Sequence, residues 1–252
     1  MLLKFFLPIG FTGLVLYEFT FFLQQQENSP PKVTITTPKK NSTFQWNSIV
    51  PYVISISDRE DGNSEYNEIS NNEVLLMVKY LPDSSQVKKY LLDRSKVNHE
   101  PLFWMSTSTC FNCHAAKTKL IGPSFEQIAQ RYTDPSGALD SLAKKIIAGS
   151  SGRWGDLKMP PHPDLKIDQA RVIVRWILKN SADADLNYIA GIEGVFRTRE
   201  KPNKEPGKGV YILTARYTDH GVKGSSRNPS DQGIRAVKGS KLGQHTVVLK
   251  NN

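Results

Sequence analysis

STSTCFNCHAAKTKLIGPSF, residues 106–125, contains both cysteines of the chain. Cys110 and Cys113 are three positions apart, and His114 follows directly. A tetrahedral zinc site needs a second pair of Cys or His ligands, and the other histidines show no paired spacing. The flanks do not show the βαβ pattern of a thioredoxin-like redox site. A plain structural disulfide gives no reason for the adjacent histidine.

The remaining interpretation of this stretch is C-x-x-C-H, the attachment signature of c-type haem. Both thiols add to the vinyl groups of the porphyrin, and a spacing of one helical turn matches the separation of those vinyls. The histidine then lies beneath the ring, where its imidazole binds the iron. The sequence therefore predicts one covalently bound haem c on Cys110 and Cys113, with His114 as an axial ligand.

A second axial ligand is also suggested by the sequence, because a methionine thioether is the usual partner of histidine in electron-carrying haems. Met77 lies in a strand-like segment, and Met105 precedes the attachment site too closely to reach over the ring. Met159 lies in GSSGRWGDLKMPPHPDL, residues 149–165, a Gly- and Pro-rich loop between two helical patterns. We therefore expect Met159 to bind the iron, with a surface-loop methionine as the alternative.

Residues from about 101 to 181 resemble the small bacterial cytochromes c that carry electrons in the periplasm. After CFNCH come IGPSFEQIAQRY, GSSGRWGDLKMPPH and an amphipathic segment ending in VIVRWIL. The resemblance implies that the Pro123 carbonyl accepts the second imidazole N–H of His114. It also implies that the Trp154 indole N–H reaches a haem propionate. Close relatives have asparagine where this chain has His162, which makes His162 a rival iron ligand.

Helical periodicity supports a small all-α domain in the same segment. Ser124 and Gln127 have the spacing of a capping box. Apolar residues at helical spacing then predict three helices, the second ending at Gly149: Phe125, Ile128, Ala129 and Tyr132; Leu139, Leu142, Ala143 and Ile146; and Ala170, Ile173, Val174 and Ile177. Trp104 is expected in a first helix that crosses the last one, and Trp176 is expected in the core.

Basic residues of this domain could surround the open edge of the haem. They are Lys117, Lys119, Arg153 and Lys158. In that position they would steer an acidic redox partner toward the haem. Solvated surface charge with no such role is the alternative.

The flanking segments have the period-2 pattern of β-strands. Residues 31–97 include NSIVPYVISISDREDG, and residues 186–250 include GVYILTARYTDHG, which resembles the penultimate strand of bacterial Ig-like domains. We expect one Ig-like sandwich, split by insertion of the haem domain, with two separate β modules as the alternative. The arrangement is similar to the Ig-like and cytochrome c segments of bacterial quinoprotein sugar dehydrogenases. The DREDG turn could bind calcium through Asp58, Glu60 and Asp61, although a solvated turn is the simpler interpretation.

The N-terminus predicts export. Residues 5–23 form a mostly apolar stretch after Lys4, at the lower limit for a membrane span, with no A-x-A-like cleavage site before Gln24. Residues 1–24 are therefore expected to be a signal anchor, or alternatively a cleaved signal peptide. The rest of the chain would lie on the periplasmic side of the cytoplasmic membrane, or in the periplasm or outside the cell after cleavage.

Composition narrows the function further. The chain is 38% hydrophobic and 23% charged, which is typical of a globular protein, and its net charge is +9. No Arg-rich run or recognition motif supports nucleic-acid binding. The expected fold class is multidomain: an all-α cytochrome c fold in an all-β Ig-like context, after an N-terminal hydrophobic helix. The expected function is electron transfer without catalytic residues. The alternatives are a peroxidase-like haem enzyme, the electron-accepting subunit of a sugar dehydrogenase, and a carbohydrate-binding or adhesion β module.

Overall fold

The computed structural model describes residues 27–95, 100–133, 135–203, 208–222 and 239–251. The predicted N-terminal membrane segment, 1–24, lies outside these residues, and none of the described helices is long and apolar enough to cross a membrane. The strands are β1 (Lys32–Thr37), β2 (Thr43–Phe44), β3 (Ile49–Asp58), β4 (Gly62–Asn63), β5 (Leu75–Leu81), β6 (Leu186–Ala190), β7 (Glu193–Arg197), β8 (Val210–Thr218) and β9 (Leu242–Asn251). The α-helices are α1 (Val87–Ser95), α2 (Glu100–Thr107), α3 (Phe125–Arg131), α4 (Pro135–Ala148) and α5 (Ile167–Asn180).

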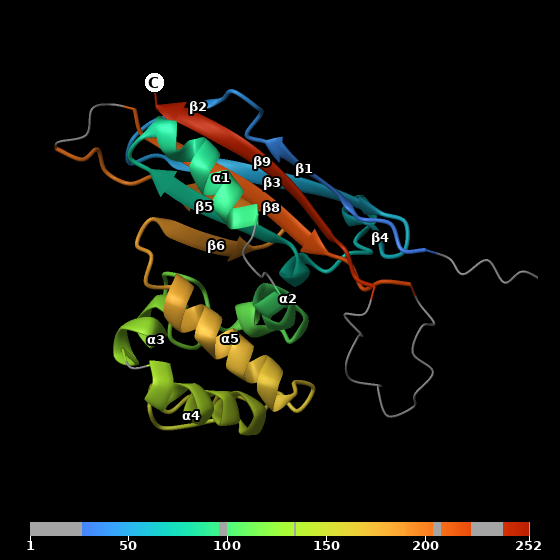
Figure 1. The fold of residues 1–252 in the computed structure, drawn as a ribbon, viewed down its shortest axis with the longest axis vertical. Coiled ribbons are helices and arrows are strands. Elements are labelled where there is room, and N and C mark those ends of the chain that lie inside the picture. Colours follow the sequence, from blue (N-terminus) through green and yellow to red (C-terminus); the bar gives the residue numbers. More distant parts are fainter. Residues whose placement is uncertain (1–26, 96–99, 134, 204–207, 223–238, 252) are drawn as a thin grey trace, which may run out of the picture.

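The strands form two sheets, and both contain strands from before and after the helical segment. In one sheet β3 pairs with β1, β4 and β7; the other has the order β2-β9-β8-β5-β6. Strand β5 pairs antiparallel with β6 and β8, whereas β2 pairs parallel with β9. Figure 1 shows helices α2 to α5 gathered together beside the sheets.

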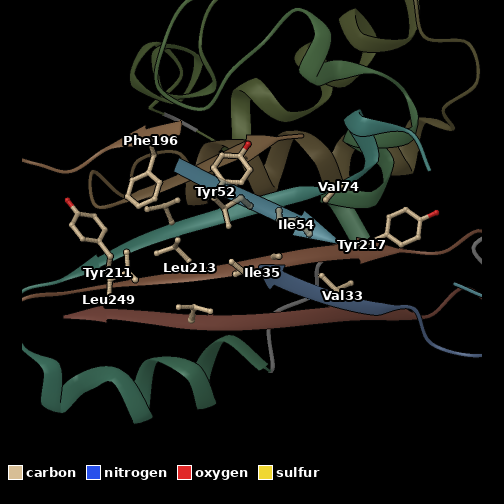
Figure 2. Close-up of a cluster of buried hydrophobic side chains, with 14 of the residues drawn as sticks. Val33, Ile35, Tyr52, Ile54, Val74, Phe196, Tyr211, Leu213, Tyr217 and Leu249 are labelled. Carbon is tan, nitrogen blue, oxygen red and sulfur yellow. The ribbon is translucent and has the colours of Figure 1, made fainter. Parts of the chain in front are cut away.

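The two sheets pack face to face around one apolar core. Alternate residues of β3 are buried, including Tyr52, Ile54 and Ile56, while the residues between them are exposed. They meet inward-facing side chains of the other sheet such as Leu213 and Leu249 (Figure 2). The period-2 pattern of the sequence therefore arises because each sheet buries one face.

A second core joins the sheet to the helices. Leu75 and Met77 of β5 and Tyr188 of β6 are buried in the same cluster as Trp104 of α2 and Trp176 of α5. The expected core position of Trp176 and the expected helix around Trp104 are confirmed. The helical segment is thus packed against the outer face of β5 and β6.

The DREDG turn is not the solvated turn that the sequence suggested. Asp58 is buried, and Asp61 Oδ2 accepts hydrogen bonds from the Tyr217 hydroxyl at 2.7 Å and from both N and Nδ1 of His220 at 2.9 Å. The other ring nitrogen of His220 lies 2.9 Å from Glu73 Oε2. Tyr217 of β8 and His220 just after this strand therefore hold the turn in a buried ionic network.

This network predicts that stability falls at alkaline pH. Burial alone would lower the pKa of His220, but its bonds to Asp61 and Glu73 outweigh that effect and raise the pKa to about 9. The protonated imidazole therefore stabilises the fold fully below pH 6.5, the ordinary pKa, and this contribution is lost as pH rises through 9. We expect a loss on the order of 3 kcal/mol in the free energy of unfolding, measured by urea denaturation between pH 6 and pH 10.

The His220→Gln variant is the control for that experiment. It keeps a polar side chain but cannot titrate, so its free energy of unfolding should lie below wild type at pH 6 and converge with it near pH 10. Equal pH dependence of the two proteins would show that His220 does not cause the loss.

Candidate functional site

A single 3₁₀ turn, η4 (Cys110–Asn112), positions the two cysteines and the histidine. It follows Thr109, whose φ of 58° is left-handed, and the amides of Cys113 and His114 both donate to the Cys110 carbonyl. The two thiols are free, and all three side chains line one cleft. Burial raises the pKa of Cys110 to about 12, so its sulfur is a neutral thiol.

His114 is buried with one ring nitrogen fixed. Its Nδ1 lies 2.7 Å from the Pro123 carbonyl oxygen, and its ring stacks on Phe125 with centroids 5.4 Å apart. Burial lowers the pKa of His114, which favours the neutral ring. A carbonyl can only accept, so the proton is on Nδ1 and the lone pair is on Nε2, ready to bind a metal. The contact that the family resemblance implied for Pro123 is present in the structure.

The cleft beside His114 is mostly apolar. The free space between its walls is about 1170 Å³ when the solvent-filled opening is counted. Helices α3, α4 and α5 supply an apolar part of its wall, formed by Ile128, Leu142, Ile146, Ile173, Val174, Ile177 and Leu178. The apolar faces that the sequence predicted on these three helices therefore serve two purposes, because they pack the helices together and line the cleft.

Met159 lines this cleft from the loop between α4 and α5. Its backbone is fixed by a two-way bridge with Ser150, in which Met159 N donates at 2.8 Å and Ser150 N donates at 3.1 Å. The bridge starts just after Gly149, whose φ of 77° ends α4 as the sequence predicted. His162 is not among the residues lining the cleft; its backbone N–H donates to the Ile146 carbonyl.

Trp154 is at the mouth of the cleft, about a third exposed. The Arg131 guanidinium lies over its ring, 4.6 Å from the centroid, and donates to the Arg153 carbonyl at 2.9 Å. These contacts fasten the loop to α3.

The positive charges at the mouth differ in part from the expected set. Arg153 and Lys158 line it, and Lys145 of α4 joins them. Lys117 instead forms a 2.9 Å ion pair with Glu126 and donates to the Asp183 carbonyl, and it does not line the cleft. Sequence spacing could not indicate Lys145, because helix packing alone brings it to the mouth.

Gly122 packs against His114 and was not predicted from the sequence as a residue of the site. A Cβ added there would lie 2.4 Å from Cε1 and 2.8 Å from Nδ1 of His114, closer than real contacts allow. We therefore expect Gly122→Ala to push the imidazole off Pro123 and to destabilise the domain by about 1–3 kcal/mol. Thermal unfolding and the visible spectrum of the haem-loaded protein would measure both effects.

Gly239→Ala is a matched control for that variant. Gly239 has a φ of 92°, so alanine adds backbone strain there, but nothing lies within 4 Å of the added Cβ, and Gly239 does not line the cleft. It should cost stability and leave the spectrum unchanged. If Gly122→Ala also had an unaltered spectrum, the close packing on His114 would have no role in ligand placement.

The donor set fits a covalently bound haem. Two free thiols, a neutral imidazole with an available Nε2 and a thioether line the same cleft. These are the groups that attach haem c and bind its iron. The apolar wall fits the porphyrin, and the cationic mouth fits its propionates.

Comparison with known proteins agrees with this fit. The Cytochrome c family model matches residues 103–181. Cytochrome c-551 of Azotobacter vinelandii is 43% identical over 72 residues, which cover 29% of this chain and 87% of the relative. Cytochrome c-551 of Pseudomonas aeruginosa is 33% identical over 88 residues, 35% of this chain and 84% of the relative. The crystal structure of Nitrosomonas europaea cytochrome c552 is 39% identical, covering 30% of this chain and 93% of that one, with a TM-score of 0.29. The chain therefore belongs to the cytochrome c family, electron-transfer proteins that carry covalently bound haem c.

Proposed function

We propose that this protein passes single electrons between redox proteins through one haem c. Cys110 and Cys113 would hold the haem by thioether bonds, and His114 and Met159 would bind its iron. The observation that carries this proposal is that one apolar cleft is lined by all four side chains, with the imidazole already fixed in the metal-binding tautomer.

Bound haem supplies a one-electron ferric–ferrous couple. The residues of the chain would hold this group and shield it. The Pro123 carbonyl orients His114, and the apolar side chains of α3, α4 and α5 exclude water from the cleft. Met159 would be the second protein ligand of the iron beside His114, and a haem held by both side chains would favour an electron carrier over a peroxidase-like enzyme, which must bind peroxide. The Trp154 indole is proposed to hydrogen-bond a propionate at the mouth.

The mouth of the cleft is the proposed docking face for redox partners. Lys145, Arg153 and Lys158 give it positive charge, and the exposed side chains of Ile121 and Leu157 lie among them. Charge of one sign around an apolar centre favours fast, weak encounters with an acidic partner. The positive charge at the opening of the cleft therefore supports a redox partner with an acidic docking surface.

For the rest of the chain, we propose that residues 31–97 and 186–250 form one Ig-like domain with the cytochrome c domain, 101–181, inserted in it. The pairing of β3 with β7 and of β5 with β6 and β8 supports this proposal. Residues 1–24 are proposed to act as a signal anchor or signal peptide that places the protein on the periplasmic side of the membrane.

Maturation of the full chain tests the proposed function. The protein is co-expressed with haem-attachment machinery, and a pyridine haemochrome spectrum and a redox titration are recorded. We expect one haem per chain, a low-spin spectrum with the weak Met-to-iron charge-transfer band, and a reversible one-electron couple. A high-spin spectrum with peroxide turnover would support the peroxidase-like enzyme instead.

A further inference from the structure

Four buried oxygen atoms at one end of the β-sandwich have no hydrogen-bond partner. They are Asn28 Oδ1, Asp58 Oδ2, Glu60 Oε1 and Asp219 Oδ2. In the described part of the chain only two other buried side-chain polar atoms lack a partner, on Trp176 and Arg216. Buried polar groups are almost always paired, because an unpaired one costs free energy. Carboxylate and amide oxygens are the ligands that Ca²⁺ takes in proteins.

Asp219 and Asn28 are each held by their other polar atom. Asp219 Oδ1 accepts from the backbone N–H groups of Gly221 at 3.0 Å and Lys241 at 2.8 Å, and from Asn28 Nδ2 at 2.8 Å. Asp219 is fully buried. Each side chain is therefore fixed in place with its remaining oxygen unused.

Asp58 and Glu60 repeat this arrangement. Asp58 Oδ1 accepts from the amides of Glu60 at 3.0 Å and Asp61 at 2.7 Å, and Ser29 Oγ donates to Glu60 Oε2 at 3.1 Å. Burial, with a smaller contribution from the charge of Asp219, raises the pKa of Asp58. These contacts connect the segment before β1, the β3–β4 turn and the end of β8, which lie at the same end of the sandwich (Figure 1).

Neighbouring charges do not satisfy the four oxygens. Lys241 Nζ donates to the backbone carbonyl of Asn28, and Arg59 Nε is 3.9 Å from Glu60 Oε1 on a largely exposed side chain. Asp61, which the sequence pattern grouped with Asp58 and Glu60, is already bonded to Tyr217 and His220. The oxygens without partners beside Asp58 and Glu60 belong instead to Asp219 and Asn28, which are both distant from this turn in the sequence.

We propose that Asn28, Asp58, Glu60 and Asp219 bind one Ca²⁺ ion. Calcium accepts six to eight oxygen ligands in flexible geometry, including amide oxygens, backbone carbonyls and water, whereas Mg²⁺ requires a near-ideal octahedron. No three Asp, Glu, His or Cys side chains in the described residues already converge as a metal cage. The ion would therefore rely on the two aspartates and the amide first, with Glu60 closing by rotation of its side chain and water completing the shell.

Calcium-dependent unfolding of the haem-loaded full chain tests this site. After treatment with EDTA, the protein is melted in a calorimeter with increasing CaCl₂ or MgCl₂. At a concentration of about 100 Kd, we expect Ca²⁺ to raise the melting temperature by roughly 5–10 °C and Mg²⁺ to raise it much less. Isothermal titration should give one Ca²⁺ per chain, with a Kd of about 10⁻⁵–10⁻³ M.

Asp219→Asn and Asp58→Asn remove one negative charge each and keep the side-chain shape. Each should lose the calcium-dependent shift while melting at or above the temperature of metal-free wild type, because repulsion among the carboxylates falls. Asp140→Asn, on an exposed carboxylate of α4, should keep the full shift. The proposal fails if wild type binds no Ca²⁺, or if Asp219→Asn responds as wild type does. The haem spectrum is a separate readout, so failure here leaves the proposed electron transfer untouched.

Discussion

Replacing both Cys110 and Cys113 with alanine is expected to abolish covalent haem attachment completely. The thioether bonds are the only covalent link available, because the chain has no other cysteine. The variant should give a haem-stained denaturing gel with no band, and acid acetone should extract any pigment that it retains. Each single variant should keep at most one thioether bond and a reduced yield of haem.

The same double variant should loosen the helices more than the sheets. Helices α3, α4 and α5 line part of the cleft, and without haem their apolar side chains there would face solvent. The core between the two sheets has no residue in that cleft, and α2 packs on β5 through its own apolar contacts. Far-UV circular dichroism should therefore lose helical signal and keep β signal. Haem that survives acid acetone in the double variant would contradict the assignment of both thiols.

The helices of the cytochrome c domain could be predicted from short sequence patterns, because helix formation and capping depend on residues close together in the chain. The capping box of Ser124 and Gln127 is present at the start of α3, and the predicted apolar stripes match α3, α4 and α5. These features can be predicted from the sequence because a helix repeats its environment every three or four residues. The grouping of the two cysteines and the histidine can be predicted for a similar reason, since a single turn places all three side chains.

The elements and contacts that depend on long-range packing could not be predicted from the sequence. Helix α1 packs on the outer face of the sheet that contains β8, near Leu81 and Ile212. It was missed because only three of its apolar side chains, those of Val87, Tyr90 and Leu91, bury part of their surface. Strand β7 was missed because EGVFR lacks alternation, and pairing with β3 alone makes it a strand. In the site, the packing of Gly122 on His114 exists only after the chain has folded.

Met159→Ala is expected to keep the haem covalently attached and to lower its reduction potential on the order of 100 mV or more, within the roughly 0.8 V that axial ligands control. The thioether is a soft ligand that favours ferrous iron, so its removal stabilises the ferric state relative to the ferrous one. The Met-to-iron charge-transfer band should vanish at the same time. Redox titration and visible spectra of the purified variant measure both.

The His162→Ala variant decides between the two candidate ligands in this loop. Because Met159 lines the cleft and His162 does not, His162→Ala should retain the charge-transfer band and shift the potential little. If instead Met159→Ala kept the wild-type reduction potential and His162→Ala lowered it, the His162 imidazole would be the ligand. The Ser150 bridge makes the first outcome the expected one, because it fixes the backbone of Met159 at the wall of the cleft that would hold the haem.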